Sequence, residues 1–331
     1  MKNDLATAQA HTNFALIKYW GKRNELLNLP AVGSISITLQ EMFTVSSLKY
    51  DAKLKRDIIE INGKTAPPGE AQRVSKFIDL FRKMAGIEIP VKVVSRNNFP
   101  TGAGLASSAS AFASLALAAD QALQLNLPKS KLSELARRGS GSAARSVYGG
   151  FVEMRMGKKS DGSDAFAVPL AEKDYWDIRV LIAITSDQQK EIGSTHGMTM
   201  TAATSPYYSQ WVMTNRADLK DMKHAIKNKD FNKLGELSEF SCLKMHAVAL
   251  STNPGLIYWN SATIDCMHAI RKLRKQNIPA YFTIDAGPQV KVICLNEDIP
   301  QILSQLKKVA GVKRIIASSL GPDALILEGN A

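Results

Sequence analysis

Short apolar runs separated by turn residues predict β-strands in the first half of the chain. The runs at 34–39, 44–50 and 91–95 have the length and apolar character of ordinary strands. A fourth run, 58–61, ends at Asn62-Gly63, a dipeptide favoured at tight hairpin turns. The first half is therefore expected to contain a sheet with at least one hairpin.

Helical spacing occurs between and after these strands. Residues 70–85 form one amphipathic helix that Gly86 is suited to end in the left-handed conformation. Residues 107–123 are almost all helix formers, and a further helix at about 130–138 closes at Gly139. The apolar face of the first helix consists of Val74, Phe77, Ile78, Phe81, Met84 and Ala85. We expect the basic residues off that face to be solvated, unless one turns toward a ligand: Arg73, Lys76, Arg82 and Lys83.

The second half of the chain predicts helices and an antiparallel sheet. Its expected order is a strand at 179–185, helices from about 206, 230 and 256, strands at 280–284 and 290–295, a helix at 300–310, and closing strands at 314–318 and 324–327. This order fits helices packed on one face of an antiparallel sheet. The predicted fold class is therefore α+β, with one domain at 1–176 and a second at 177–331.

The composition is typical of a water-soluble globular protein, with 45% hydrophobic and 22% charged residues. A chain of 331 residues is long enough for two domains with ordinary cores. No apolar run reaches membrane-spanning length and the N-terminal residues lack a signal-peptide core, so we expect a cytoplasmic protein with no membrane partner. Cys242, Cys266 and Cys294 lack CxxC spacing, which predicts reduced and partly buried thiols.

The formal net charge of +12 indicates an anionic partner. A nucleic-acid-binding module is one interpretation, and it predicts salt-dependent binding to RNA or DNA without ATP turnover. The basic residues are spread along the chain, and the densest group, within 271–275, lies at the end of one predicted helix. A polyanionic small molecule suits this charge at least as well, so we expect no nucleic-acid partner.

Residues 100–110, PTGAGLASSAS, combine a glycine-rich turn with the start of a helix. Anionic oxygens bind at helix starts because the first N–H groups lack internal partners and the helix dipole is positive there. Gly102 and Gly104 let the backbone approach a phosphate, and Ser107 offers a hydroxyl to a metal ion. The segment is not a Walker A loop, because it contains no lysine. A serine-capped turn before a core helix is the alternative.

The segment 11–22, HTNFALIKYWGK, ends in two lysines separated by aromatic residues and glycine. Lys18 and Lys22 can hold diphosphate oxygens while the Tyr19 phenol supplies another hydrogen bond. An amphipathic edge strand with solvated lysines is the alternative.

Two further segments contain candidate chemistry. Asp285 closes an apolar strand within YFTIDAGP, and a carboxylate held at the mouth of a cleft is expected to have a raised pKa and to be a better base. A turn-initiating aspartate is the alternative there. Residues 140–145, SGSAAR, offer hydroxyls, close backbone approach and the fork-shaped cation of Arg145, although serine and glycine also collect in ordinary loops.

These segments together resemble a known enzyme family. Residues 100–110 match the second motif of the GHMP kinase superfamily at Pro100, Gly104, Leu105, Ser107, Ser108, Ala109 and Ser110. With HTNFALIKYWGKRNE, GSGSAARSVYGG, GSTHGM and YFTIDAGP, in this order across nearly the full chain, the sequence resembles the diphosphomevalonate decarboxylase family. The resemblance implies a two-domain GHMP kinase fold, with a ribosomal-protein-S5-domain-2-like N-terminal domain and a ferredoxin-like C-terminal domain, commonly as a homodimer.

The implied reaction uses (R)-5-diphosphomevalonate and ATP with Mg²⁺. It phosphorylates the 3-hydroxyl, then loses phosphate and CO₂ to give isopentenyl diphosphate. By the resemblance, the catalytic residues are Asp285, Lys18 and Arg145. Substrate contacts are implied for Tyr19, Trp20, Gly21, Lys22, Arg73, Ser140, Gly141, Ser142, Ala143, Ala144, Arg145 and Thr195. ATP phosphate contacts are implied for Gly102, Ala103, Gly104, Leu105, Ala106, Ser107, Ser108 and Ala109.

A related activity remains an alternative at the level of sequence. A GHMP enzyme could phosphorylate the same hydroxyl and stop there, or accept mevalonate or its monophosphate. Full decarboxylation is favoured by the presence of Asp285, Arg145 and Lys22. One basic residue more or less could change how many phosphate groups the preferred substrate carries.

Overall fold

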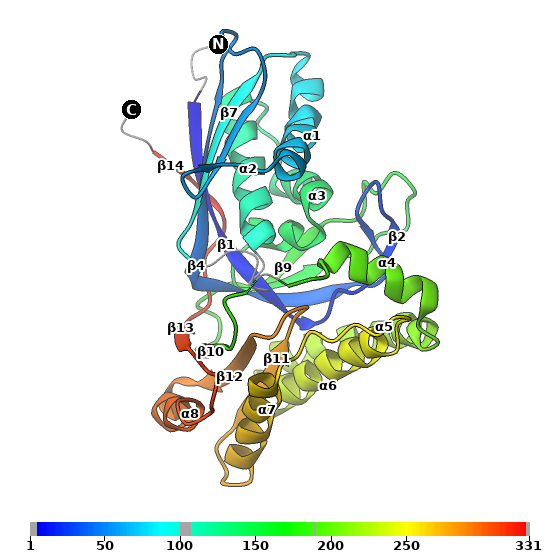
Figure 1. The fold of residues 1–331 in the computed structure, drawn as a ribbon, viewed down its shortest axis with the longest axis vertical. Helices are drawn as coiled ribbons and strands as arrows, with labels where there is room; N and C mark the ends of the chain where they lie inside the picture. The colour runs from blue at the N-terminus through cyan, green and yellow to red at the C-terminus, as the bar shows by residue number, and fades with distance from the viewer. Residues whose placement is uncertain (1–4, 100–106, 189, 329–331) are drawn as a thin grey trace.

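The chain folds into two β-sheets that meet end to end, with helices packed on each (Figure 1). The structure, a computed structural model, describes residues 5–99, 107–188 and 190–328. Within these residues eight strands form the first sheet, four form the second, and a short hairpin of β2 (Lys22–Asn24) and β3 (Leu29–Pro30) stands apart. The mixed α+β class and the two-domain layout expected from the sequence are both confirmed.

The first sheet is built around two long antiparallel strands, β1 (Leu5–Ile17) and β4 (Ser34–Tyr50). The sequence predicted two separate strands where β4 runs unbroken. The sheet order is β14-β1-β4-β7-β5-β6, with β8 paired to β4 and β9 paired to β8. The other strands are β5 (Ile58–Ile61), β6 (Lys64–Thr65), β7 (Val91–Asn97), β8 (Phe151–Met154), β9 (Ala167–Ala171) and β14 (Leu325–Leu327).

Local turn signals in this half are confirmed. Asn62 and Gly63 both have positive φ and join β5 to β6, the conformation that this dipeptide favours. Gly86 is left-handed at φ 66° and ends α1 (Pro68–Ala85). The remaining helical elements of this half are α2 (Ser107–Leu123), α3 (Lys129–Gly139) and the 3₁₀ segment η1 (Gly141–Val147).

Two predictions for α1 are wrong. Met84 is 43% exposed, because the helix buries only its central turns against the sheet and α2. Arg82 is buried instead of solvated: its guanidinium bonds Asp57 ahead of β5 and the Ile89 carbonyl, so it fixes the helix end to the neighbouring loop. The apolar stripe of Val74, Phe77, Ile78 and Phe81 is buried as predicted.

The second sheet has the antiparallel order β11-β12-β10-β13. Its strands are β10 (Ile178–Ile184), β11 (Ala280–Ile284), β12 (Val290–Leu295) and β13 (Arg314–Ser318). Its helical elements are α4 (Ser194–Thr204), α5 (Tyr208–Lys227), α6 (Phe231–Leu250), α7 (Ser261–Arg274), η2 (Asn296–Asp298) and α8 (Ile299–Leu306). The sequence did not predict α4, and it wrongly assigned the last strand to this sheet: β14 crosses back and pairs with β1.

Side chains of β10 point alternately into two cores. Leu181 and Ala183 pack with α7 and α8, whereas Val180 and Ile182 pack against β1 and β4 of the first sheet. One face of the second sheet is therefore covered by α7 and α8. The other face closes the junction between the sheets and also packs against α5 and α6, so the prediction of helices on one face only is wrong. The boundary predicted between residues 176 and 177 remains a prediction.

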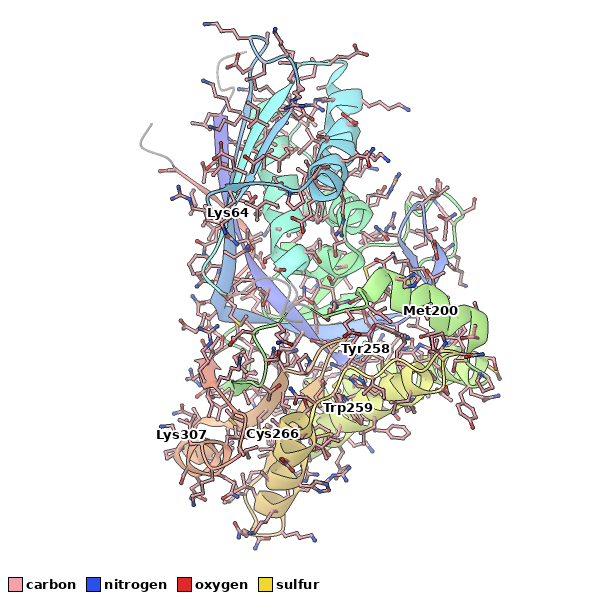
Figure 2. The ribbon with its side chains drawn as sticks, in the orientation of Figure 1. Lys64, Met200, Tyr258, Trp259, Cys266 and Lys307 are labelled. Atoms are coloured by element: carbon pink, nitrogen blue, oxygen red, sulfur yellow. The ribbon has the colours of Figure 1, made fainter. Side chains whose placement is uncertain are left out.

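The three cysteines are free and fully buried, Cys266 on α7 (Figure 2). Across the described ranges, none of the helices combines the length and apolar character needed to cross a bilayer.

Helix α6 packs on β11 at the closest approach that a glycine allows. A β-carbon at Gly235 would lie 2.0 Å from the Tyr281 ring. Tyr281 is on β11, the strand that ends next to Asp285. The glycine therefore sets the distance between the helix and the strand that positions the candidate catalytic carboxylate.

We expect Gly235→Ala to lower the free energy of unfolding by about 2 kcal/mol, because the ring or the helix must move to admit the methyl group. Gly69→Ala in α1 is the matched control, since no described atom lies within 4 Å of its β-carbon position. The control should be neutral or stabilised by up to about 1 kcal/mol. Urea unfolding measures both, and equal stability of Gly235→Ala and the wild type would contradict the packing argument.

Candidate active site

A cavity of about 420 Å³ lies where the two sheets meet. Its walls come from the end of β1, the start of α2, the η1 segment, the start of α4 and the end of β11. The structure brings thirteen of the predicted residues to this cavity: Lys18, Tyr19, Trp20, Lys22, Arg73, Ser107, Ser108, Ser140, Gly141, Ser142, Arg145, Thr195 and Asp285.

The other predicted residues that the structure describes do not line it. Ala143 and Ala144 are fully buried in the core behind η1, and Ala109 is buried within α2. Gly21 has φ 103° and packs against Tyr208. Residues 102–106 (Gly102, Ala103, Gly104, Leu105 and Ala106) lie outside the described residues.

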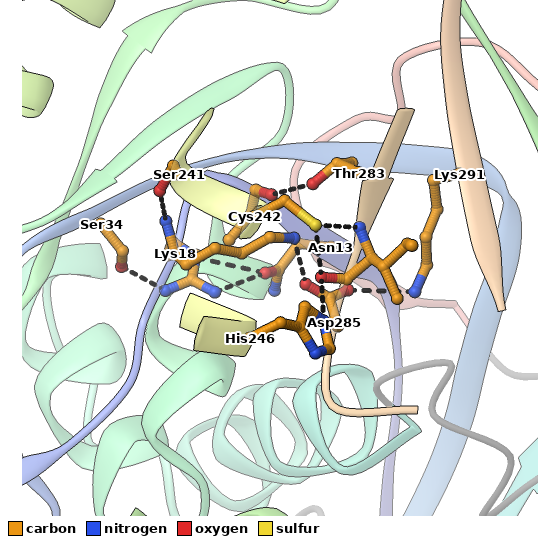
Figure 3. A network of polar contacts seen from close by, with 12 residues as sticks. Asn13, Lys18, Ser34, Ser241, Cys242, His246, Thr283, Asp285 and Lys291 are labelled. Carbon is orange, nitrogen blue, oxygen red and sulfur yellow. Dashed lines mark hydrogen bonds and ion pairs between the residues drawn. The ribbon is translucent and has the colours of Figure 1, made fainter. Parts of the chain in front are cut away.

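Asp285 is held between two buried lysines (Figure 3). Lys18 Nζ lies 2.6 Å from Oδ1, and Lys291 Nζ lies 3.1 Å from Oδ2. Burial alone raises the pKa of Asp285, but the charges and hydrogen bonds of the two lysines outweigh it and hold the pKa well below its usual range. The expectation of a raised pKa is therefore wrong. The cations responsible come from β12 and from just beyond β1, which the local sequence around Asp285 does not reveal.

Helix α6 supports this carboxylate from behind. Cys242 Sγ accepts a hydrogen bond from the Ile284 amide at 3.2 Å, and His246 Nε2 lies 3.3 Å from the Ile284 carbonyl oxygen. Burial lowers the pKa of His246 to about 3 and raises that of Cys242 to about 11, so both are uncharged near neutral pH. Ser241 Oγ accepts from the Lys18 amide at 2.9 Å. One helix thereby positions the backbone beside both Lys18 and Asp285.

Arg145 faces the cavity from η1 and is held by neutral partners. Its Nη1 donates to Ser34 Oγ at 2.6 Å, and its Nε and Nη2 donate to Asn13 Oδ1 at 3.2 and 3.0 Å. Asn13 in turn donates to Ser146 Oγ at 2.7 Å. Burial lowers the pKa of Arg145 to about 10, so the guanidinium stays charged at neutral pH. Sequence analysis missed Asn13 and Ser34, which lie within long strands and show no local signal.

Three more cations line the cavity. Lys22 Nζ donates to Thr195 Oγ1 at 3.2 Å, which joins two predicted residues from opposite halves of the chain. Arg73 bonds the Gly139 carbonyl through Nε and Nη2, at 3.2 and 2.7 Å. Lys190, which sequence analysis missed, donates to the Ala286 carbonyl at 2.9 Å, and burial lowers its pKa to about 8. The segment around Lys190 shows no motif or periodicity that predicts a functional residue.

The substrate loop expected at 140–145 contacts both the start of α2 and Tyr19. Ser140 Oγ lies 3.1 Å from Ser108 Oγ. A β-carbon at Gly141 would lie 2.5 Å from Tyr19 Oη, so only glycine fits without moving the ring. The Tyr19 hydroxyl is buried without a hydrogen-bond partner among the described residues, and burial raises its pKa. An unsatisfied hydroxyl in a cavity wall is available to a ligand.

The arrangement suits a polyanionic ligand that carries one uncharged hydroxyl. Of the residues that the structure describes, five cations and a single carboxylate line the cavity. Among the described residues no group of three or more acidic, histidine or cysteine side chains could cage a metal. Mg²⁺ commonly takes one or two protein oxygens together with phosphates and water, and the Ser107 hydroxyl offers such an oxygen.

Comparison with known proteins identifies relatives over nearly the whole chain. The profile described as "Diphosphomevalonate decarboxylase-like N-terminal domain" matches residues 10–167, and that of "Mevalonate 5-diphosphate decarboxylase C-terminal domain" matches 180–322. Diphosphomevalonate decarboxylase of Candida albicans is 36% identical, with 96% of each chain covered.

Solved structures agree in fold. Mevalonate diphosphate decarboxylase from Staphylococcus aureus has a TM-score of 0.93 and 39% identity, with 98% of each chain covered. The enzyme MDDEF in complex with MVAPP, AMPPCP and magnesium has a TM-score of 0.92 and 38% identity, with 98% of this chain and 99% of that chain covered. With both halves matched by the family's two domains and the family's motifs gathered at one cavity, the chain belongs to the diphosphomevalonate decarboxylase family.

Proposed function

We propose that this chain catalyses the ATP-dependent decarboxylation of (R)-5-diphosphomevalonate to isopentenyl diphosphate. The observation that carries the proposal is the cavity in which Asp285, clamped by Lys18 and Lys291, faces Arg145 and the start of α2. The MDDEF complex with MVAPP, AMPPCP and magnesium supports the same ligand set for this chain.

Different cations of the cavity are suited to different anionic groups of the substrate. Lys22 and Arg73 are suited to the diphosphate, with Tyr19, Trp20, Thr195 and the 140–145 segment around it. Arg145 spends three of its five N–H donors on Asn13 and Ser34, so its two Nη groups each keep one N–H for the substrate carboxylate. Such a bidentate contact fixes the torsion of the bond that breaks.

Asp285 accepts a hydrogen bond from the 3-hydroxyl and aligns it. A carboxylate whose pKa lies far below neutrality is a weak base, so its main contribution is orientation. When bound, ATP supplies the phosphoryl group and Mg²⁺ offsets its charge, with Ser107 and Ser108 at the phosphate end of the site. As phosphate leaves C3 with the electrons of the C–O bond, positive charge develops at C3. The bond between C2 and the carboxylate carbon then breaks, and its electrons form the C2=C3 double bond as CO₂ departs. Lys190 and Lys18 stabilise the departing phosphate.

A coupled measurement of CO₂ and ADP tests the proposal. With diphosphomevalonate and Mg-ATP, we expect equal amounts of both products. Mevalonate and its monophosphate serve as comparison substrates, and ADP without CO₂ would identify a 3-kinase. Decarboxylation that prefers the monophosphate, or salt-sensitive RNA binding without ATP turnover, would each replace the proposed activity.

Removal of the Asp285 charge should slow turnover far more than binding. We expect Asp285→Asn to lower kcat by about 100-fold or more with a small change in substrate KM, because the orientation of the hydroxyl matters most in the transition state. Asp79→Asn, at an exposed carboxylate of α1 that pairs with Arg82, is the control and should turn over normally. Steady-state kinetics measures both, and normal turnover of Asp285→Asn would remove the residue from the mechanism.

We also propose a cytoplasmic homodimer. Three buried, free cysteines support a reducing compartment. Exposed apolar side chains support self-association through the outer face of α5 and α6: Met213 is 71% exposed and Phe240 55% exposed. Lys244 of α6 connects the two helices here, because its Nζ contacts the Phe240 ring and lies 3.4 Å from Oγ1 of Thr214, the residue after Met213. Apolar patches of this kind commonly mark interfaces between proteins.

Light scattering should give twice the chain mass for the wild type. The double variant Met213→Glu/Phe240→Glu should give a monomer, since buried charges oppose association. Ile58→Glu, on the start of β5, is the control and should remain dimeric. A monomeric wild type would rule out the dimer, and a dimeric double variant would rule out this face.

A further inference from the structure

Lys291 is a buried lysine within an otherwise apolar strand. It lies on β12, VKVICL, opposite Thr283 of β11 in the antiparallel register. Cross-strand partners point to the same face of a sheet. On that face Thr283 lies against β1, where its Oγ1 is 3.5 Å from the Ala15 carbonyl oxygen. The register thus directs Lys291 to the junction between the sheets, where Asp285 lies.

The two lysines approach Asp285 from opposite sides (Figure 3). Lys18 pairs with Oδ1 of Asp285 and lines the cavity. Lys291 pairs with Oδ2 and is not among the residues that line the cavity. The Lys291 side chain is only 4% exposed. Lys291 therefore contacts the carboxylate from the side away from the ligand.

We propose that Lys291 is a positioning residue for the reaction: from behind Asp285, its ammonium group fixes the plane of the carboxylate and keeps it ionised while the other side receives the substrate hydroxyl. The inference rests on the proposed decarboxylase function. A lysine at a buried strand position is costly unless it is paired, and an apolar residue would satisfy the packing of β12 alone. The ion pair with Asp285 therefore explains why a lysine occupies this buried position.

Several groups face Asp285 and set its protonation together. Burial raises the pKa of Asp285 and the nearby positive charges lower it. Without Lys291 fewer positive charges would act, so the pKa of Asp285 would rise toward or above its ordinary value. Because a raised pKa protonates the carboxylate at higher pH, activity would be lost on the acid side of neutrality. The facing groups are Lys18 beyond β1, Lys291 on β12, Arg145 on η1, Lys190 ahead of α4, and Cys242 and His246 on α6.

Two variants separate charge from orientation. Lys291→Gln retains a hydrogen-bond donor for Oδ2 without charge, and Lys291→Met retains only the apolar stem. For both, the acid limb of kcat/KM should move upward by about one to three pH units. At the pH plateau, kcat of Lys291→Gln should stay within about threefold of the wild type, while that of Lys291→Met should fall about tenfold or more with substrate KM changed less than threefold.

The control is Lys223→Met, which removes an exposed lysine that pairs with Glu153 and should leave the pH profile unchanged. Thermal unfolding verifies that each variant is folded. ¹³C NMR of protein labelled at aspartate Cγ, with the Asp285 signal identified from Asp285→Asn, gives the titration without turnover. A wild type that releases no CO₂ overturns the proposed function, while the NMR titration still reports on Lys291.

The proposal is overturned if the folded Lys291 variants titrate Asp285 as the wild type does and retain its kcat. It is also overturned if only KM rises, because that result would indicate direct ligand binding by Lys291. An upward shift of the acid limb together with the same shift in the Asp285 titration supports it.

Discussion

The contact of one carboxylate with two lysines joins the two sheets at the point where chemistry occurs. Asp285 follows β11, Lys291 lies on β12, and Lys18 follows β1 of the other sheet. Each of these charges is expensive to bury unless it is paired. The junction must therefore close around all three groups together, so the position of the carboxylate is set by the packing of the two sheets and not by a local turn alone.

Periodicity predicted most of the fold, because it reports local burial. It located α1, its left-handed end at Gly86 and the Asn62-Gly63 turn, each of which depends on residues close in sequence. It failed where contacts between residues far apart in the sequence determine burial or strand pairing. Met84 has the spacing of a buried residue but is exposed in the last turn of α1, and β14 has the pattern of a strand but nothing in its sequence selects β1 as its partner.

The residues of the candidate site were likewise predicted only in part from local sequence. Motifs marked Lys18, Arg145 and Asp285, and the structure brings them to one cavity. Their supporting residues were missed because each lies in a separate element. Lys291 becomes relevant only when the register of β11 and β12 is known, and Lys190 only when its contact with the Ala286 carbonyl is known. The pKa of Asp285 was predicted in the wrong direction for this reason, since the strand sequence reveals burial but not the cations of other strands.

The distribution of counterions indicates how a substrate is oriented. Asp285 has both oxygens occupied by lysines, whereas Arg145 and Lys190 are held by hydroxyl, amide and carbonyl oxygens. Cations held by neutral dipoles can bind an anion without first breaking an ion pair, and they are already in position when it arrives. A phosphate or carboxylate is repelled by Asp285, but a hydroxyl is not. We therefore expect the anionic groups of the substrate to bind at Arg145, Lys190 and the cations nearby, which leaves the alcohol as the part that meets the carboxylate.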